Sequence, residues 1–168
     1  MTLPYVEPLT RRELGEKVLP EPPRRGEPGG EPCGPCGGEN EHTIWADEHW
    51  ILHHGVHTSL PGAVWLTCRE HVDSFSDLPP QLAAEFGPLA ARIDRALQTL
   101  PDVARVHLYR WGDGGAHFHV WFLPRPSGRP EMHGHMLPVW EEVLPEVGQD
   151  AIDDAKAAIA KALADDAG

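Results

Sequence analysis

The alternation of apolar and polar residues predicts several short strands in the middle of the chain. Residues 43–55 and 61–68, "TIWADEHWILHHG" and "PGAVWLTC", are aromatic and β-branched runs separated by glycine and proline, as in a hairpin or meander. Residues 104–111 and 116–125, "ARVHLYRW" and "AHFHVWFLPR", are two further predicted strands. The glycine-rich residues 112–115 between them are typical of a turn.

A three-to-four-residue spacing of apolar positions predicts a long helix between these strand pairs. It is carried by Leu82, Phe86, Leu89, Ile93 and Leu97. Asp77 is the expected N-cap, and Pro79 and Pro80 fall in the tolerated first turn. The pair Gly87–Pro88 should bend this helix.

The end of the chain predicts a second helix and a packed connection that leads to it. Residues 150–166 are rich in alanine, begin with acids that suit a helix N-terminus, and carry a thin apolar stripe of Ile152, Ile159 and Leu163. Residues 128–147 are expected to pack apolar side chains onto the sheet, namely Leu137, Val139, Trp140 and Leu144. The predicted fold class is therefore α+β with an antiparallel sheet.

One predicted strand carries candidate chemistry on a single face. Successive strand residues point to opposite faces, so His117, His119 and Trp121 line one side. The other side carries the apolar residues Phe118, Val120 and Phe122 and can seal against a core. A lone histidine is commonly structural, but two on one face favour metal binding or catalysis.

Length and composition bound the domain organisation. The 168 residues suit one domain with tails: a Pro/Gly-rich extended arm over residues 1–32, a domain over residues 33–147, and a C-terminal helix over residues 148–168 that packs on the domain or trails it. No stretch resembles a signal peptide or a membrane span. We therefore expect a cytoplasmic protein without a membrane partner.

Charge narrows the class of ligand. A net charge of −12 argues against general nucleic-acid binding, which requires a positive field. Residues 105–129 nevertheless hold four arginines and one acid, so a small phosphorylated ligand is compatible with the histidine strand. An ordinary solvated face would give the same charge pattern.

The Cys33–Cys36 pair is a candidate metal half-site. The two-residue spacing lets both thiolates reach one zinc ion, whereas a redox dithiol would normally open a helix, which the surrounding glycines and prolines prevent. Zinc then needs two more ligands from eleven histidines. The clusters His53/His54/His57 and His133/His135 stay open as alternatives.

From Cys33 to Pro126 the chain resembles the histidine triad (HIT) superfamily, which includes nucleotide hydrolases and nucleotidyltransferases such as galactose-1-phosphate uridylyltransferase. The resemblance is carried, in order, by "CGPC", by "LPGAVWLTCREHVDSFSDL", by the helix after it, and by "HFHVWFLPRP". It implies an antiparallel sheet of about five strands with one long helix and a C-terminal helix, and a homodimer.

The resemblance also implies residue roles. In zinc-containing members the matching positions hold a structural zinc ion, which here are Cys33, Cys36, His71 and His117. His119 matches the nucleophile that attacks the α-phosphorus of a nucleotide or similar phosphate ester. Arg110 and Arg125 are candidates to stabilise the phosphate charge, although both could be plain surface arginines.

The third triad position departs from the family pattern. It is His or Gln in the family and Trp121 here, and indole can donate one hydrogen bond or stack on a base but cannot relay a proton. Two functions follow from this departure. The first is a hydrolase or nucleotidyltransferase that works through a nucleotidyl-His119 intermediate; the second is a non-catalytic nucleotide- or partner-binding module that lost turnover together with its third histidine.

Overall fold

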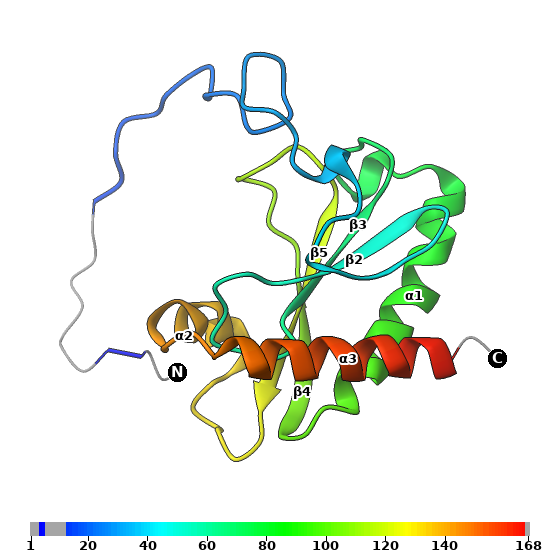
Figure 1. Ribbon diagram of the computed structural model, residues 1–168. Coiled ribbons are helices and arrows are strands. Elements are labelled where there is room, and N and C mark those ends of the chain that lie inside the picture. Colours follow the sequence, from blue (N-terminus) through cyan, green and yellow to red (C-terminus); the bar gives the residue numbers. More distant parts are fainter. Residues whose placement is uncertain (1–3, 6–12, 167–168) are drawn as a thin grey trace.

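The computed structural model describes residues 4–5 and 13–166, and over these residues five strands form one antiparallel sheet in the order β1-β2-β3-β5-β4 (Figure 1). The strands are β1 (Thr43–Ala46), β2 (Trp50–His54), β3 (Val64–Cys68), β4 (Val103–Tyr109) and β5 (His119–Pro126). The predicted α+β class and antiparallel sheet are confirmed. The register pairs Thr67 with His119 and Trp65 with Trp121.

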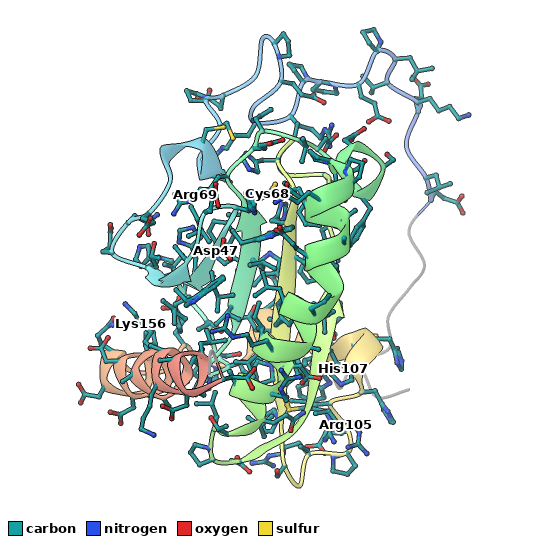
Figure 2. All side chains as sticks on the ribbon, turned by 90° about the vertical axis from the view of Figure 1, so that its right-hand side faces the viewer. Asp47, Cys68, Arg69, Arg105, His107 and Lys156 are labelled. Carbon is teal, nitrogen blue, oxygen red and sulfur yellow. The ribbon has the colours of Figure 1, made fainter. Side chains whose placement is uncertain are left out.

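Two helices cover one face of this sheet. They are α1 (Pro80–Gln98) and α3 (Gln149–Asp165), and Figure 2 shows α1 lying lengthwise along the strands. A short helix, α2 (Leu137–Val143), packs with the second apolar cluster described below. Three 3₁₀ turns, at Pro35–Gly37, Phe75–Asp77 and Gly134–Met136, complete the described elements.

The main core lies between the helices and one face of the sheet. Phe118, Val120 and Phe122 are at most 2% exposed and belong to this core, as the alternation along the strand predicts. Both long helices contribute side chains to this core, and Ile93 of α1 and Ile159 of α3 are fully buried. The opposite face of β5 is thereby free to present His119 and Trp121.

A smaller apolar cluster covers the far end of that opposite face. It contains Leu60, Leu123, Met132 and Leu137, with Tyr109, Trp121 and Trp140 packed against it. The predicted packing of residues 128–147 holds for Leu137 and Trp140, whereas Val139 is half-buried and belongs to neither apolar cluster. The prediction is wrong for Leu144, which is 36% exposed because α2 ends at Val143 and the chain becomes extended there.

The start of α1 differs from the prediction. Asp77 does not cap the helix; its carboxylate accepts hydrogen bonds from the Ser74 backbone and hydroxyl within the preceding 3₁₀ turn. Pro79 is the N-cap, with extended backbone (φ −52°, ψ 148°). A residue before proline is disfavoured in the helical region, so Pro80 holds Pro79 out of the helix and begins the helix itself. The helix then continues through Gly87 and Pro88.

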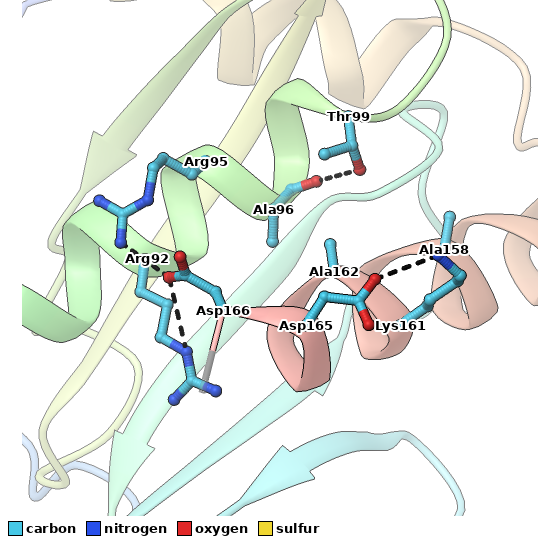
Figure 3. A pocket seen from close by; sticks show the side chains of 9 residues that line it. All are labelled: Arg92, Arg95, Ala96, Thr99, Ala158, Lys161, Ala162, Asp165 and Asp166. Carbon is cyan, nitrogen blue, oxygen red and sulfur yellow. Dashed lines mark hydrogen bonds and ion pairs between the residues drawn. The ribbon is translucent and has the colours of Figure 1, made fainter. Parts of the chain in front are cut away.

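Helix α3 is joined to α1 by charged contacts as well as by the core. Asp166 forms an ion pair with Arg95 at 2.7 Å and lies 3.9 Å from Arg92 Nε (Figure 3). Arg92 also donates to the Leu163 carbonyl. These side chains border a hollow of about 440 Å³ between the two helices. No predicted site residue lines that hollow.

Removing the Ile159 side chain should destabilise the fold, because it is fully buried where α3 meets the core. An Ile-to-Ala change in a packed core costs about 2–5 kcal/mol. Ile159→Ala should therefore lower the free energy of unfolding in urea by that amount, whereas the outward Lys161→Ala should change it little. Equal effects of the two variants would mean that α3 is not part of the cooperative core.

Candidate functional site

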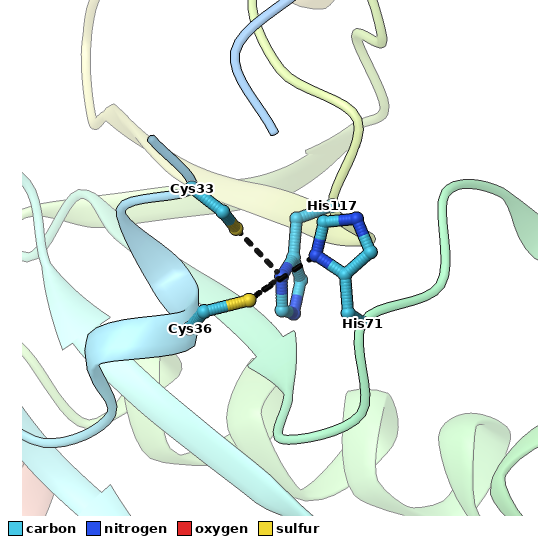
Figure 4. A group of neighbouring side chains, drawn as sticks. All are labelled: Cys33, Cys36, His71 and His117. Atoms are coloured by element: carbon cyan, nitrogen blue, oxygen red, sulfur yellow. Dashed lines mark hydrogen bonds between the residues drawn. The ribbon is translucent and has the colours of Figure 1, made fainter. Parts of the chain in front are cut away.

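Four side chains from three separate segments converge at one end of the sheet. Their ligand atoms, the sulfurs of Cys33 and Cys36 and one ring nitrogen each of His71 and His117, all lie within 4.8 Å of one another (Figure 4). Cys33 Sγ is 3.1 Å from His117 Nδ1, and Cys36 Sγ is 3.1 Å from His71 Nδ1. Two sulfurs and two imidazole nitrogens at this spacing match a tetrahedral metal site.

Local contacts hold the cysteine segment near the two histidines. The 3₁₀ turn at Pro35–Gly37 brings both thiols to the same side. Arg69, two residues before His71, donates to the Asp47 carbonyl at 2.9 Å and pairs with Glu39 at 2.6 Å; Figure 2 shows Arg69 beside Asp47. Arg69 therefore connects the segment after Cys36, which contains Glu39, to the turn between β1 and β2, which contains Asp47.

The ring of His117 is oriented by a backbone contact. Its Nε2 lies 2.8 Å from the Cys68 carbonyl, which can only accept, so Nε2 carries the proton and Nδ1 presents its lone pair to the sulfurs. Such a partner on the second nitrogen is characteristic of metal-ligating histidines. His117 is 2% exposed, and this hydrogen bond satisfies the ring where water cannot reach it.

His119 is held in the complementary tautomer. Its Nδ1 lies 2.8 Å from the His117 carbonyl, so Nδ1 donates and Nε2 keeps a free lone pair. Burial lowers the pKa of His119, and the positive charge of Arg110 lowers it further. A neutral imidazole with one free nitrogen is the form that can act as a nucleophile.

His119 lines a pocket of about 230 Å³, and the pocket lining also includes Cys33 and His117 of the candidate metal cluster. Its walls include the indoles of Trp65 and Trp121, whose ring centroids are 6.3 Å apart, and the ring of His117. Arg25, an exposed residue, also lines this pocket. The pocket therefore combines aromatic surface, an arginine residue in its lining and one free imidazole nitrogen.

Arg25 reaches this pocket because the N-terminal segment is hydrogen-bonded to the domain. The Arg25 carbonyl accepts from Ala116 N at 2.8 Å, immediately before the histidine strand. Its neighbour Arg24 pairs with Asp73 at 2.5 Å and donates to the Gly112 carbonyl at 2.7 Å. At Gly26 the backbone has φ +89°, and a Cβ there would come within 3.1 Å of the His71 ring, so a glycine suits this contact.

The predicted phosphate-binding arginines lie outside the lining of this pocket. Arg110 donates to the Asp73 carbonyl at 2.6 Å and to the Trp111 carbonyl, and its guanidinium lies 5.9 Å from the Phe118 ring centre. Arg125 lies six residues beyond His119 along β5, about 20 Å away for an extended strand, and contacts the Pro126 and Arg129 carbonyls. The structure brings neither guanidinium onto the walls around His119.

The alternative histidine clusters do not converge. His53 and His54 are adjacent on β2 and therefore point to opposite faces, and burial lowers the pKa of each to about 4. His57 is exposed beside Glu146, and the His133 and His135 rings stack on each other 5.7 Å apart at the surface. Across the described residues, the Cys33/Cys36/His71/His117 group is the one candidate metal cluster.

Two aromatic or charged residues of the pocket, Trp65 and Arg25, escaped the sequence analysis. Trp65 could have been found, because the register of β3 against β5 places it directly opposite Trp121. Arg25 carried no signal, because it stands in a Pro/Gly-rich segment whose backbone position depends on a long-range contact with residues 115 and 116.

Comparisons with known proteins identify the fold. No family model matches the sequence, and no curated protein matches it. Over the described residues, no helix is both long and apolar enough to cross a membrane.

Several solved structures are similar to this one. A Zn-bound histidine triad family protein from Mycobacterium smegmatis aligns with a TM-score of 0.60 at 18% identity, over 79% of this chain and 94% of that one. A histidine triad protein from Marinobacter aquaeolei VT8 gives 0.61 at 16% identity, over 74% and 89%. A Plasmodium falciparum diadenosine triphosphate hydrolase, in complex with Cyclomarin A, gives 0.54 at 12% identity, over 73% and 77%.

These alignments cover most of both chains, and the matching architecture is the five-stranded antiparallel sheet with its long helix. The chain therefore has the histidine triad fold.

Proposed function

We propose that the protein is a zinc-containing enzyme that transfers or hydrolyses nucleotidyl groups through a covalent bond to His119. The observation that carries the proposal is the His119 tautomer: Nδ1 donates to the His117 carbonyl, so Nε2 is free inside a pocket that also holds Arg25. A neutral nucleophile beside a cation suits attack on an anionic phosphorus.

Zinc fits the donor set of the proposed metal centre. Cys33, Cys36, His71 and His117 supply two sulfurs and two nitrogens, the borderline-soft ligands that zinc prefers. Four protein ligands complete a tetrahedron and leave no position for a reacting water. In this proposal the ion fixes the strand start at His117 and stabilises the fold.

The proposed reaction has two steps. His119 Nε2 forms a bond to phosphorus while the bond to the leaving oxygen breaks, and that oxygen takes the electron pair. Arg25 stabilises the charge on the phosphoryl oxygens, and Arg110 adds positive potential from behind the strand. Water, or an acceptor hydroxyl or phosphate, then displaces His119 and gives up its proton to solvent.

Trp121 determines which leaving groups suit the site. Its indole cannot protonate the departing oxygen, so the first step favours leaving groups that are stable as anions, such as phosphates and pyrophosphates. The indole lies beside Trp65 on the same sheet face, with ring centroids 6.3 Å apart, and can stack on a nucleobase.

The test is a search for the intermediate. The protein is incubated with nucleoside di- and triphosphates and dinucleoside polyphosphates, quenched, and analysed by mass spectrometry. A nucleotidyl group on His119 supports the enzyme. Tight nucleotide binding without adduct or product supports a binding module instead, the function that the loss of the third histidine favours.

Arg25→Ala should weaken binding of nucleotides. A hydrogen bond to a charged group contributes about 1.5–3 kcal/mol, so the dissociation constant of a nucleoside monophosphate should rise roughly tenfold to a hundredfold. Arg105→Ala is the matched control, because it also removes one positive charge but from an exposed position on β4. Calorimetric titration measures the dissociation constants of both variants. An equal change in the two would contradict a direct contact between Arg25 and the nucleotide.

The proposal includes a homodimer. Among the described residues β4 pairs only with β5, so its other edge is open, and Leu108 on this strand is 46% exposed. An open strand edge with exposed apolar surface is suited to pairing with a second copy. Light scattering after size exclusion should give the mass of two chains.

A further inference from the structure

A second pocket, of about 250 Å³, lies on the other side of Trp121 from the pocket that contains His119. Trp121 lines both pockets. The second pocket is walled by Trp111 and by the carboxylate-bearing residues Glu141 and Glu142, over an apolar floor that includes Leu123 and Pro138. We propose that this pocket binds an organic ammonium group.

The two indoles are held in place for such a role. The Trp111 ring stacks on Tyr109, with centroids 5.1 Å apart and planes 9° from parallel. The Trp121 ring lies so close over Gly55 that a Cβ there would approach its Cζ3 to 3.2 Å. Fixed indole faces attract alkylammonium groups through the ring quadrupole, and tryptophan does so best.

The charge around the second pocket is negative. Glu141 Oε1 accepts a hydrogen bond from Ser59 N at 3.2 Å, which holds this carboxylate against the hairpin. Glu141 and Glu142 lie in the last turn of α2, and that turn carries no basic residue. The free carbonyls at a helix C-terminus add to the attraction for a cation. Within the described chain, no lysine or arginine lines this pocket; the remaining ionisable residue of its lining is His57, whose Nδ1 lies 3.3 Å from Glu146 Oε2.

The two pockets therefore differ in the ligand chemistry that they favour. The pocket at His119 offers Arg25 and suits a phosphate, whereas the pocket beyond Trp121 offers two carboxylates and suits a cation. Resting on the proposed function, the inference assigns a substrate class: a phosphate compound whose leaving group or acceptor carries an alkylammonium group. The apolar floor fits the alkyl part of that group.

Choline and its uncharged carbon isostere, 3,3-dimethylbutan-1-ol, test the site directly by calorimetric titration of the full chain. Choline should bind at least tenfold more tightly than the isostere. The double variant Glu141→Gln/Glu142→Gln should lose at least tenfold in choline affinity, since each glutamine keeps the shape and an acceptor oxygen. Glu13→Gln/Glu16→Gln is the control, because it changes the net charge equally at exposed positions.

A third variant separates aromatic from purely ionic attraction. Trp111→Leu should weaken choline binding severalfold while leaving the weak binding of the isostere unchanged. Equal binding of choline and the isostere, no binding of choline, or an equal loss in both double variants would overturn the inference. Melting curves establish that each variant is folded.

These outcomes stay distinct from a failure of the proposed function. His119→Ala should bind choline as the unmodified protein does, because His119 does not line this pocket. Selective choline binding without any nucleotidyl adduct would support the ammonium site and contradict the proposed enzymatic function. An adduct on His119 without selective choline binding would support the proposed enzyme and contradict the ammonium site.

Discussion

Replacing His119 with alanine is expected to abolish turnover and leave the fold and the metal content unchanged. The side chain is half-buried on the sheet face opposite the main core, and its one hydrogen bond goes to the His117 carbonyl, so its removal disturbs little packing. The bond-forming nitrogen, however, disappears with it. Loss of a nucleophile in a covalent mechanism lowers kcat by about 10⁴-fold or more.

The measurement combines steady-state kinetics with metal analysis and mass spectrometry. The variant should bind one equivalent of zinc, melt close to the unmodified protein, and give no nucleotidyl adduct. His135→Ala is the matched control, because His135 is an exposed histidine with a ring stacked on His133. Turnover that survives in His119→Ala would rule out the covalent mechanism.

Removal of the proposed zinc ion is expected to have the largest effect on stability. The four proposed ligands come from the cysteine segment, from the loop after β3 and from the residues that precede β5, so a single ion would connect three parts of the chain. Closed zinc sites contribute directly to folding free energy. Loss of about 3 kcal/mol or more should lower Tm by roughly 10 °C in a chain of this size.

Cys33→Ser should reproduce the effect of a strong chelator, and the two treatments should not add. The control is Cys68→Ala, because Cys68 is buried, donates to the Glu70 carbonyl, and is not part of the cluster. Burial also raises the pKa of its thiol to about 11, so it stays protonated. One equivalent of tightly bound zinc in Cys33→Ser would contradict the ligand assignment.

Much of the fold was accessible from the sequence because the relevant signals are local. The alternation from Phe118 to Phe122 predicted which face of β5 is buried, and the apolar spacing from Leu82 to Leu97 predicted α1. The candidate metal cluster could also be predicted, but not from local signals alone. Eleven histidines left its ligands open, and a resemblance chose His71 and His117, which the structure brings to Cys33 and Cys36.

The rest depended on contacts between distant residues. Arg110 looked free to bind phosphate, but Asp73 and the Trp111 carbonyl occupy its guanidinium, and neither contact can be read from a sequence. The N-cap of α1 was misplaced because the backbone restriction at Pro79 outweighed the capping tendency of Asp77. The position of Arg25 could not be predicted, because it depends on the pairing of its segment with Gly115, close to the start of β5.

The segment from Arg24 to Gly26 has a practical consequence for anyone who engineers this protein. Arg24 is salt-bridged to Asp73, Arg25 lines the pocket, and Gly26 packs against His71. A shortened version that starts at Cys33 would keep every proposed zinc ligand and the nucleophile, yet open one wall of the cleft to solvent. Affinity tags and fusion partners therefore belong upstream of this segment or at the other terminus, and trimming to the apparent domain boundary would yield a damaged binding cleft.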